Sequence, residues 1–271
     1  MDRETWLLWL LADSQLPTGG FVASAGLEAA LQAGLVNESA SETEQSSFVH
    51  FIRTSAHNQA HFALPFCSLA HEQTLQLLAD TVSSEEHTVA AVLDRLQHID
   101  NYHQTMLSSN SVAMRASVAQ GGGLLSLFNR GYVHARFMDD VRGRLCAQIA
   151  KQLQRMARLG KVRAHWPVVF GFVCAATGIS VEHAQQLFMF QFVRQIFSAA
   201  IRLNLVGPLH AQALQCDMHM EVADLLHKCG RLRPAFDTEE DVFGESAVYT
   251  DPILELYQGM HDRLYSRIFN S

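Results

Sequence analysis

Apolar residues recur at helical spacing along almost the whole chain, and this pattern constrains the fold more than any other feature. Residues 137–159 are the clearest case. Val141, Leu145 and Ile149 follow one another at four-residue steps and so share one helix face. Gly160 then ends the pattern, as glycine commonly does after a helix. No alternating strand pattern of useful length appears, so the sequence predicts an all-α fold.

The other periodic segments predict one domain of about ten helices. Residues 180–205 should form the longest helix, with Ser180 as its cap. We expect Pro65 to divide one helix and Gly121-Gly122-Gly123 to break another. Further expectations are a short apolar turn at 6–11, a cap at Ser41, a buried apolar helix at 168–176, and helices at 21–33, 89–99, 106–118 and 209–226.

The chain also divides by composition into a core and an arm. A helical core is expected over residues 1–230, followed by a polar linker at 231–248 and an amphipathic C-terminal arm at 249–271. Asp251-Pro252 marks the start of the helical part of this arm.

The arm carries a large apolar area for a chain end. Met260, Leu264 and Ile268 recur at four-residue steps, which predicts a helix, and Tyr265 and Phe269 lie beside this stripe. Chain ends usually fray unless something holds them. We therefore expect the arm to be buried, either on its own core or in the groove of a partner.

Composition excludes several classes of protein. Hydrophobic residues make up 48% and charged residues 17% of the chain, which favours a surface partly covered by partner proteins. A net charge of −7 gives no broad field for nucleic acid. Five scattered cysteines fit a reducing, cytoplasmic compartment. We expect neither a secretory signal nor a membrane span, because polar residues interrupt the most apolar stretch, 187–206.

A histidine pair is the main candidate for metal chemistry. His57 and His61 are four residues apart and share a helix face, as paired zinc ligands do. The intervening Asn58-Gln59-Ala60 lacks the glutamate of a zinc-protease helix, and two histidines do not complete a site. A polar helix face and part of a metal site both remain possible from the sequence.

Other catalytic signatures are missing. The triple glycine at 121–123 is not followed by Lys-Ser or Lys-Thr, so it is not a phosphate loop. Arg194 and Arg202 lie on nearly one face of an apolar helix, where arginines pair with carboxylates or backbone carbonyls, at an interface or inside the core. These observations favour an interaction protein over an enzyme.

Four segments, in order, carry a family resemblance. They are Leu16-Pro17-Thr18-Gly19-Gly20-Phe21 with Ser24 and Gly26-Leu27-Glu28; Pro167 to Gly171 with Thr177-Gly178-Ile179; Ala199 to Leu203 with Leu205 and Gly207-Pro208; and His261-Asp262 with Leu264 to Ser271. Together they resemble the UreF family of urease accessory proteins. Thr18, Asp262 and Asn270 depart from the residues usual in that family.

The resemblance implies an all-α homodimer that is not an enzyme and has no catalytic residues, resident metal or cofactor. It implies binding to the accessory protein UreD, also called UreH, and through that complex to the GTPase UreG. The assembly would deliver nickel to apo-urease, and the nickel would pass through the complex. The C-terminal arm would become ordered on UreD. The alternative function is a metal-dependent enzyme that uses His57 and His61.

Residue roles follow from the same resemblance. The expected UreD contacts are Tyr249, Met260, His261, Leu264, Tyr265, Arg267, Ile268 and Phe269. The expected UreG contacts are Glu28, Arg194 and Arg202, and the alternative for Glu28 is pairing with an arginine. Pro17, Gly19 and Gly20 should form a structural turn, because a positive φ there would exclude most other residues.

Overall fold

We describe the protein in a computed structural model, which covers residues 1–13, 15–37, 47–79, 84–234 and 247–271. These ranges hold ten α-helices, four short 3-10 helices and no strand, so the predicted all-α class is confirmed. The expected cap at Ser41 and residues 235–246 of the expected linker lie outside them. No helix within the described ranges is long and apolar enough to cross a membrane.

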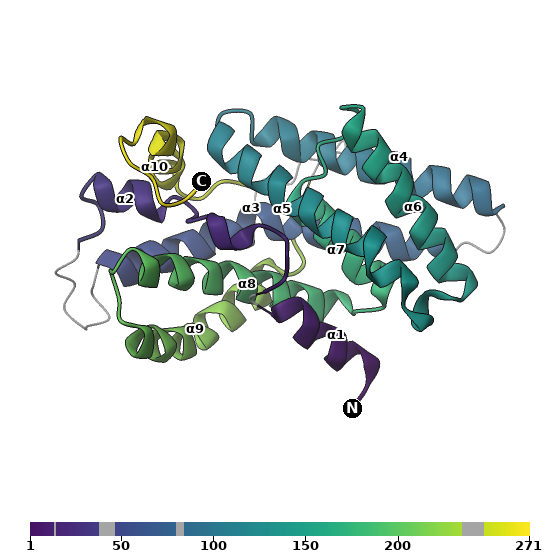
Figure 1. Cartoon of the computed structure of the whole chain (residues 1–271), viewed down its shortest axis with the longest axis horizontal. Helices are drawn as coiled ribbons and strands as arrows, with labels where there is room; N and C mark the ends of the chain where they lie inside the picture. The colour runs from purple at the N-terminus through teal and green to yellow at the C-terminus, as the bar shows by residue number, and fades with distance from the viewer. Residues whose placement is uncertain (14, 38–46, 80–83, 235–246) are drawn as a thin grey trace.

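The chain order of the elements is shown in Figure 1. The helices are α1 (Arg3–Ala12), α2 (Leu27–Gln32), α3 (Ser47–Leu78), α4 (Glu85–Met106), α5 (Ser111–Arg130), α6 (Val141–Arg158), α7 (Trp166–Thr177), α8 (Val181–Arg202), α9 (Pro208–Cys229) and α10 (Pro252–Met260). The 3-10 turns are η1 (Gly20–Val22), η2 (Tyr132–His134), η3 (Arg136–Met138) and η4 (His261–Arg263).

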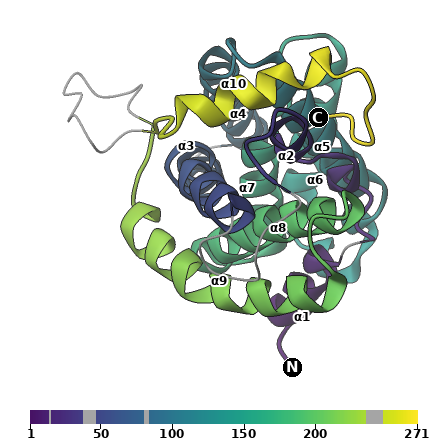
Figure 2. The ribbon, with the colours of Figure 1, turned by 90° about the vertical axis from the view of Figure 1, so that its left-hand side faces the viewer.

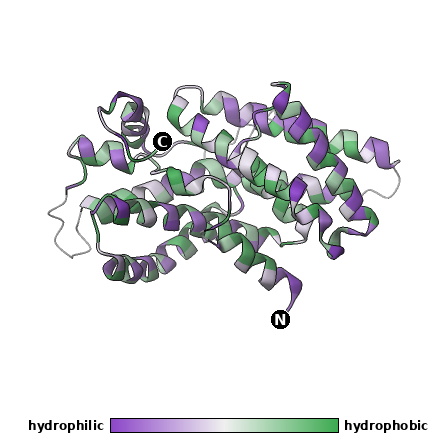
Figure 3. Cartoon of the chain, viewed as in Figure 1, coloured by the Kyte–Doolittle hydropathy of each residue, from purple (hydrophilic) through white to green (hydrophobic). Residues whose placement is uncertain are grey.

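The long helix α3 is the centre of the core and packs against α4, α7, α8 and α9. Figure 2 shows α3 between α10 above and α9 below. Every residue of α7 after Trp166 is buried, as its all-round apolar sequence predicts. The outer helices α6 and α9 mix hydrophilic and hydrophobic residues (Figure 3). The arm helix α10 packs on α2 and α5.

Pro65 does not divide a helix, contrary to our expectation. It lies inside α3, which at 32 residues is longer than α8, the helix that we expected to be longest and that ends at Arg202. A proline has no N–H, so the carbonyl of His61, four residues earlier, receives no helical hydrogen bond. The Val248 N–H donates to that carbonyl instead, at 3.1 Å. The segment that leads into α10 thus satisfies the group that Pro65 leaves unpaired.

The triple glycine does not break a helix either, because it lies within α5. A Cβ atom at Gly121 would lie 2.0 Å from the Ala164 carbonyl oxygen, and one at Gly123 would lie 3.0 Å from the Thr18 Cα. Glycine destabilises a helix interior by roughly 1 kcal/mol relative to alanine. Here it permits two backbone segments to approach α5 closely, which a larger residue would prevent.

Two predicted helices are shorter than expected. The segment 21–33 is interrupted at Ala25 and Gly26, which both have positive φ. The arm is helical only to Met260 and the η4 turn, so the helix predicted through Phe269 is wrong. Backbone N–H groups near Phe269 bond to side chains and carbonyls of the core, as described below, and these bonds replace the helical ones.

Candidate partner-binding site at the arm

The segment before α2 contacts the arm, and its backbone path requires glycine at two positions. Gly19 has a φ of +79°, which an L-residue rarely adopts, whereas Gly20 is not in the left-handed region. Gly26 has a φ of +87°, and a Cβ there would lie 3.2 Å from the Gln258 side chain on α10. The backbone can therefore turn sharply after Pro17 and approach the arm at Gly26.

Glu28, in the first turn of α2, binds the backbone of the arm. Its carboxylate accepts hydrogen bonds from the N–H groups of Ile268 at 2.6 Å and Phe269 at 3.1 Å. Only 1% of Glu28 is exposed. We predicted a contact with UreG, or a pairing with an arginine, for this residue. In this conformation its side chain has no surface for a partner, and its bonds are to the chain's own arm.

His261 of the arm lies beside the same carboxylate. Its ring is fully buried, with Nε2 3.1 Å from the Phe269 carbonyl oxygen and Nδ1 3.9 Å from a Glu28 oxygen. The bond from Nε2 folds the last residues back toward the η4 turn. We expected His261 to bind UreD, but here it lies inside the protein.

Arg202, the last residue of α8, lies between two aromatic rings. Its guanidinium carbon is 3.8 Å from the centre of the Phe21 ring and 4.3 Å from that of Phe269. Its Nε donates to the Ser198 carbonyl oxygen, and burial lowers the pKa of the guanidinium. Phe269 is 2% exposed, so the ring that we expected to bind UreD packs on Arg202 of its own core.

Further hydrogen bonds hold the arm, and the residues that make them were not among those predicted from the sequence. The Ser24 N–H and hydroxyl both donate to the Ser271 oxygen, at 2.6 and 2.9 Å, and the Asn270 N–H donates to the Val22 carbonyl. Arg115 on α5 makes two bonds to Asp262, at 2.7 and 2.9 Å, and these lower the pKa of that carboxyl. In the sequence, only the opposite charges of Arg115 and Asp262 indicate that they could pair.

Several apolar side chains of the arm and the adjoining turn remain exposed. Tyr265 is fully exposed and Ile268 is 63% exposed. Phe21, which covers one face of Arg202, is also 63% exposed. On α10, the exposed side chains are Ile253, Leu256 and Met260, which recur at helical spacing. We call the exposed set Phe21, Ile253, Leu256, Met260, Tyr265 and Ile268 the apolar rim.

The other predicted UreD contacts take different positions. Tyr249 stacks on Phe62 of α3, with ring centres 4.1 Å apart, and its burial raises the pKa of its hydroxyl. Leu264 is half-buried, and Arg267 is exposed and lies 3.4 Å from Asp262. Of the eight predicted residues, all on the arm, those that are exposed are Met260, Tyr265, Arg267 and Ile268.

A groove runs along α8, beside the segment that joins α1 to η1. It has a volume of about 680 Å³, and its walls include Phe21, Arg194, Arg202 and Gln215. The Arg194 guanidinium donates to the Ala12 carbonyl oxygen at 2.6 Å, which joins α8 to the end of α1. We call this hollow the α8 groove.

The histidine pair does not form a metal site in the described residues. The His57 and His61 rings stack with centres 4.1 Å apart, and His61 Nδ1 donates to the His57 carbonyl. His57 Nδ1 lies 3.1 Å from the Thr250 hydroxyl, where the arm begins. Across the described ranges, no group of three or more histidine, cysteine, aspartate or glutamate residues is placed to hold a metal ion.

Known proteins resemble this chain over nearly its full length. The sequence profile of the UreF family matches residues 43–219. The chain is 30% identical to urease accessory protein 6 of Cryptococcus neoformans var. grubii, over 99% of this chain and 98% of that protein. It is 31% identical to urease accessory protein F of Oryza sativa subsp. indica, over 99% and 85% of the two chains. It is also 31% identical to urease accessory protein F of Arabidopsis thaliana, over 98% and 92%.

Proposed function

Since the chain belongs to the UreF family of urease accessory proteins, with a role in urease maturation, we propose that it is an adaptor for nickel insertion. It binds UreD through the arm, recruits the GTPase UreG, and in that assembly delivers nickel to apo-urease in the cytoplasm. Nickel is the cargo of the complex, and we propose no resident cofactor and no catalytic residue. The metal-dependent enzyme is not favoured by any observation at His57 and His61.

The apolar rim is the observation that carries the UreD part of the proposal. Exposed aromatic and aliphatic side chains on an ordered segment are typical of interface anchors. Fully burying one large apolar side chain stabilises a complex by roughly 1.5–3 kcal/mol. Tyr265 and Ile268 together would therefore contribute about 3–6 kcal/mol if UreD covered both.

A charged substitution tests this part of the proposal. Ile268→Asp should abolish co-purification with UreD and leave the thermal midpoint unchanged, because the Ile268 side chain is exposed. Leu209→Asp is the matched control, since Leu209 is 87% exposed on α9, outside the rim. Deletion of residues 249–271 should also remove UreD binding. UreD binding by the Ile268→Asp variant at the wild-type level would refute the assignment.

The α8 groove supports the UreG part. It combines Arg194 and Arg202 with amide side chains, and Arg202 is held by two rings rather than free to extend. In our proposal Arg202 shapes this surface for UreG and does not reach into the nucleotide site. Gln215→Trp, which narrows the groove, should reduce UreG recruitment while UreD still binds. His219→Trp, at an exposed position of α9, is the control; equal recruitment by both variants would contradict the proposal.

Homodimerisation is the remaining part of the proposal. Trp6, Trp9 and Leu10 are exposed on α1, which packs on α8, and they give this end of the molecule an apolar surface. Light scattering of the isolated protein should give twice the monomer mass, and Trp9→Glu should return it to the monomer mass. A monomer in the wild type would overturn this part alone.

A further inference from the structure

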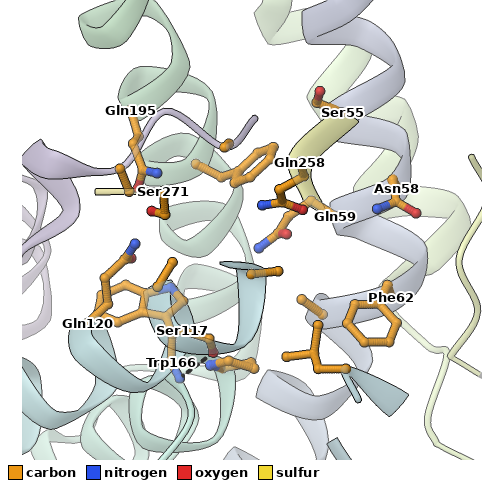
Figure 4. A pocket seen from close by; sticks show the side chains of 18 of the residues that line it. Ser55, Asn58, Gln59, Phe62, Ser117, Gln120, Trp166, Gln195, Gln258 and Ser271 are labelled. Atoms are coloured by element: carbon orange, nitrogen blue, oxygen red, sulfur yellow. Dashed lines mark hydrogen bonds between the residues drawn. The ribbon is translucent and has the colours of Figure 1, made fainter. Parts of the chain in front are cut away.

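A pocket lies where α10 crosses the core. Its volume is about 140 Å³, and its walls come from α3, α4, α5, α7, α8 and the arm. Figure 4 shows the amide side chains of Gln59 and Gln258 facing those of Gln120 and Gln195 across the space. A cavity needs roughly 10–15 Å³ of such volume for one water molecule. This arm pocket therefore has room for a molecule of several non-hydrogen atoms.

Uncharged groups dominate the walls of the arm pocket. Five glutamines line it together with Ser55, Asn58 and Ser117, and Phe62 and Trp166 provide apolar surface. No lysine or arginine is among the described residues that line it. Its one carboxylate side chain, Glu255, already accepts a hydrogen bond from the Ser109 hydroxyl. The walls thus offer many donors and acceptors but little net charge.

The imidazole ring of His103, which lines the pocket, has no hydrogen-bond partner within the described structure. His103 is 2% exposed, and both of its ring nitrogens are buried and unpaired. Its ring packs against Phe66 and His165, with ring centres 4.7 Å away in each case. Burial lowers its pKa well below the usual value, so the ring is neutral and offers one donor and one acceptor. Leaving both nitrogens unpaired costs free energy that a bound polar molecule would recover.

A second unpaired group lines the same pocket. The Gln191 side chain donates through Nε2 to the Leu11 carbonyl, but its Oε1 atom is buried without a partner. This oxygen is an acceptor, so it fits a ligand with an N–H donor. The neutral ring of His103 provides one donor and one acceptor, and the unpaired oxygen of Gln191 provides a second acceptor, so a ligand that pairs with all three needs both donors and an acceptor.

Three ligand classes fit these walls poorly. A metal ion lacks a set of ligands, because no group of three candidate side chains occurs among the described residues. An anion lacks a cationic partner, and the two lining residues best placed to face a cation, Glu255 and Ser271, already accept hydrogen bonds from Ser109 and Ser24. We propose that the arm pocket binds a small neutral molecule of the carboxamide class, with His103 and Gln191 as its hydrogen-bonding partners.

Three probes of equal size test the class of ligand. Acetamide, acetate and acetamidinium have the same heavy-atom skeleton and differ in charge. In NMR titrations of the full chain, acetamide should give saturable shifts with a roughly millimolar dissociation constant, which is within reach of four heavy atoms. The two ions should bind at least tenfold more weakly. No saturable acetamide shift, or equal binding of all three probes, would overturn the proposal.

A substitution on α4 tests the position. His103→Leu should weaken acetamide binding at least tenfold while the thermal midpoint stays the same or rises, because two unpaired nitrogens are removed. His87→Leu, at an exposed position of the same helix, should bind acetamide normally. If His103→Leu does not fold, Gln191→Leu takes its place with the same expectation. Normal acetamide binding by the folded variant would place the ligand elsewhere and refute the assignment.

Discussion

Replacing Glu28 by alanine should release the arm from the core without unfolding the core. The carboxylate is the acceptor for two arm N–H groups, those of Ile268 and Phe269. Alanine removes both hydrogen bonds and leaves the Phe269 N–H buried with no acceptor. These changes destabilise the docked arm relative to the undocked arm.

The size of the effect follows from these contacts. A hydrogen bond to a charged group contributes about 1.5–3 kcal/mol, so two contribute about 3–6 kcal/mol. Because the arm lies at one end of the chain, it can open locally while the helices of the core stay packed. Each 1.4 kcal/mol corresponds to roughly a tenfold change in an equilibrium constant. The open population should therefore rise by about 100-fold or more.

Hydrogen exchange measures this population directly. The amide protons of Ile268, Phe269 and Asn270 should exchange about 100-fold faster or more in Glu28→Ala, while those of α7 keep their protection. Glu221→Ala is the control, since Glu221 pairs with Arg53 in a partly exposed salt bridge that contributes at most about 1 kcal/mol. Unchanged exchange in the arm, or an equal loss of protection in α7, would show that Glu28 does not hold the arm in the way described.

Three further predictions concern the core and its junction with the arm. Gly121→Ala should lower the free energy of unfolding by about 2 kcal/mol or more, because its Cβ would lie 2.0 Å from a carbonyl oxygen. Gly122→Ala places its Cβ within 4 Å of no atom and should be neutral or stabilising by up to about 1 kcal/mol. Denaturant unfolding measures both effects, and equal effects would contradict the packing argument. Hydrogen bonds from the Ser180 N–H, the Ser180 hydroxyl and His183 lower the pKa of Glu4 from 4.5 to about 2. The contribution of Glu4 to stability is therefore fully present above pH 4.5 and is lost as the pH falls toward 2. The stability difference between wild type and Glu4→Gln should shrink over that range, and a constant difference would contradict this role of Glu4. Arg202→Ala removes two ring contacts, each worth roughly 0.5–2 kcal/mol, and should make proteolysis of the arm faster, whereas Arg194→Ala should not; arm proteolysis at the wild-type rate in Arg202→Ala would refute this role.

The all-α class could be predicted because helical periodicity is a local property of the sequence. Errors arose where a distant backbone atom decides the outcome. Pro65 is tolerated inside α3 because Val248 donates to the carbonyl of His61. The triple glycine lies inside α5, where the absence of a Cβ at Gly121 leaves room for the Ala164 carbonyl. Neither contact leaves any trace in the spacing of nearby residues, so no local rule could have predicted these helices correctly.

The sequence identified most residues of the site but not their mutual arrangement. Glu28, Arg202 and Phe269 belong to three separate segments of the family resemblance, and the structure brings all three together. A charged residue and an aromatic residue both suggest contacts with a partner when they are considered alone. Their burial against each other depends on the fold of the entire chain. That is why the sequence did not predict the hydrogen bonds from the arm to Glu28.

The core holds the arm mainly through main-chain groups, and this has a consequence for sequence variation. The N–H groups of Val248, Ile268, Phe269 and Asn270 donate to the core, and the carbonyl of Ser266 accepts from it. Every amino acid except proline supplies the same N–H group. Substitutions of the outward side chains can therefore accumulate without detaching the arm. Proteins with this fold could exchange one binding partner for another by drift at a few exposed positions, and a designer could do the same.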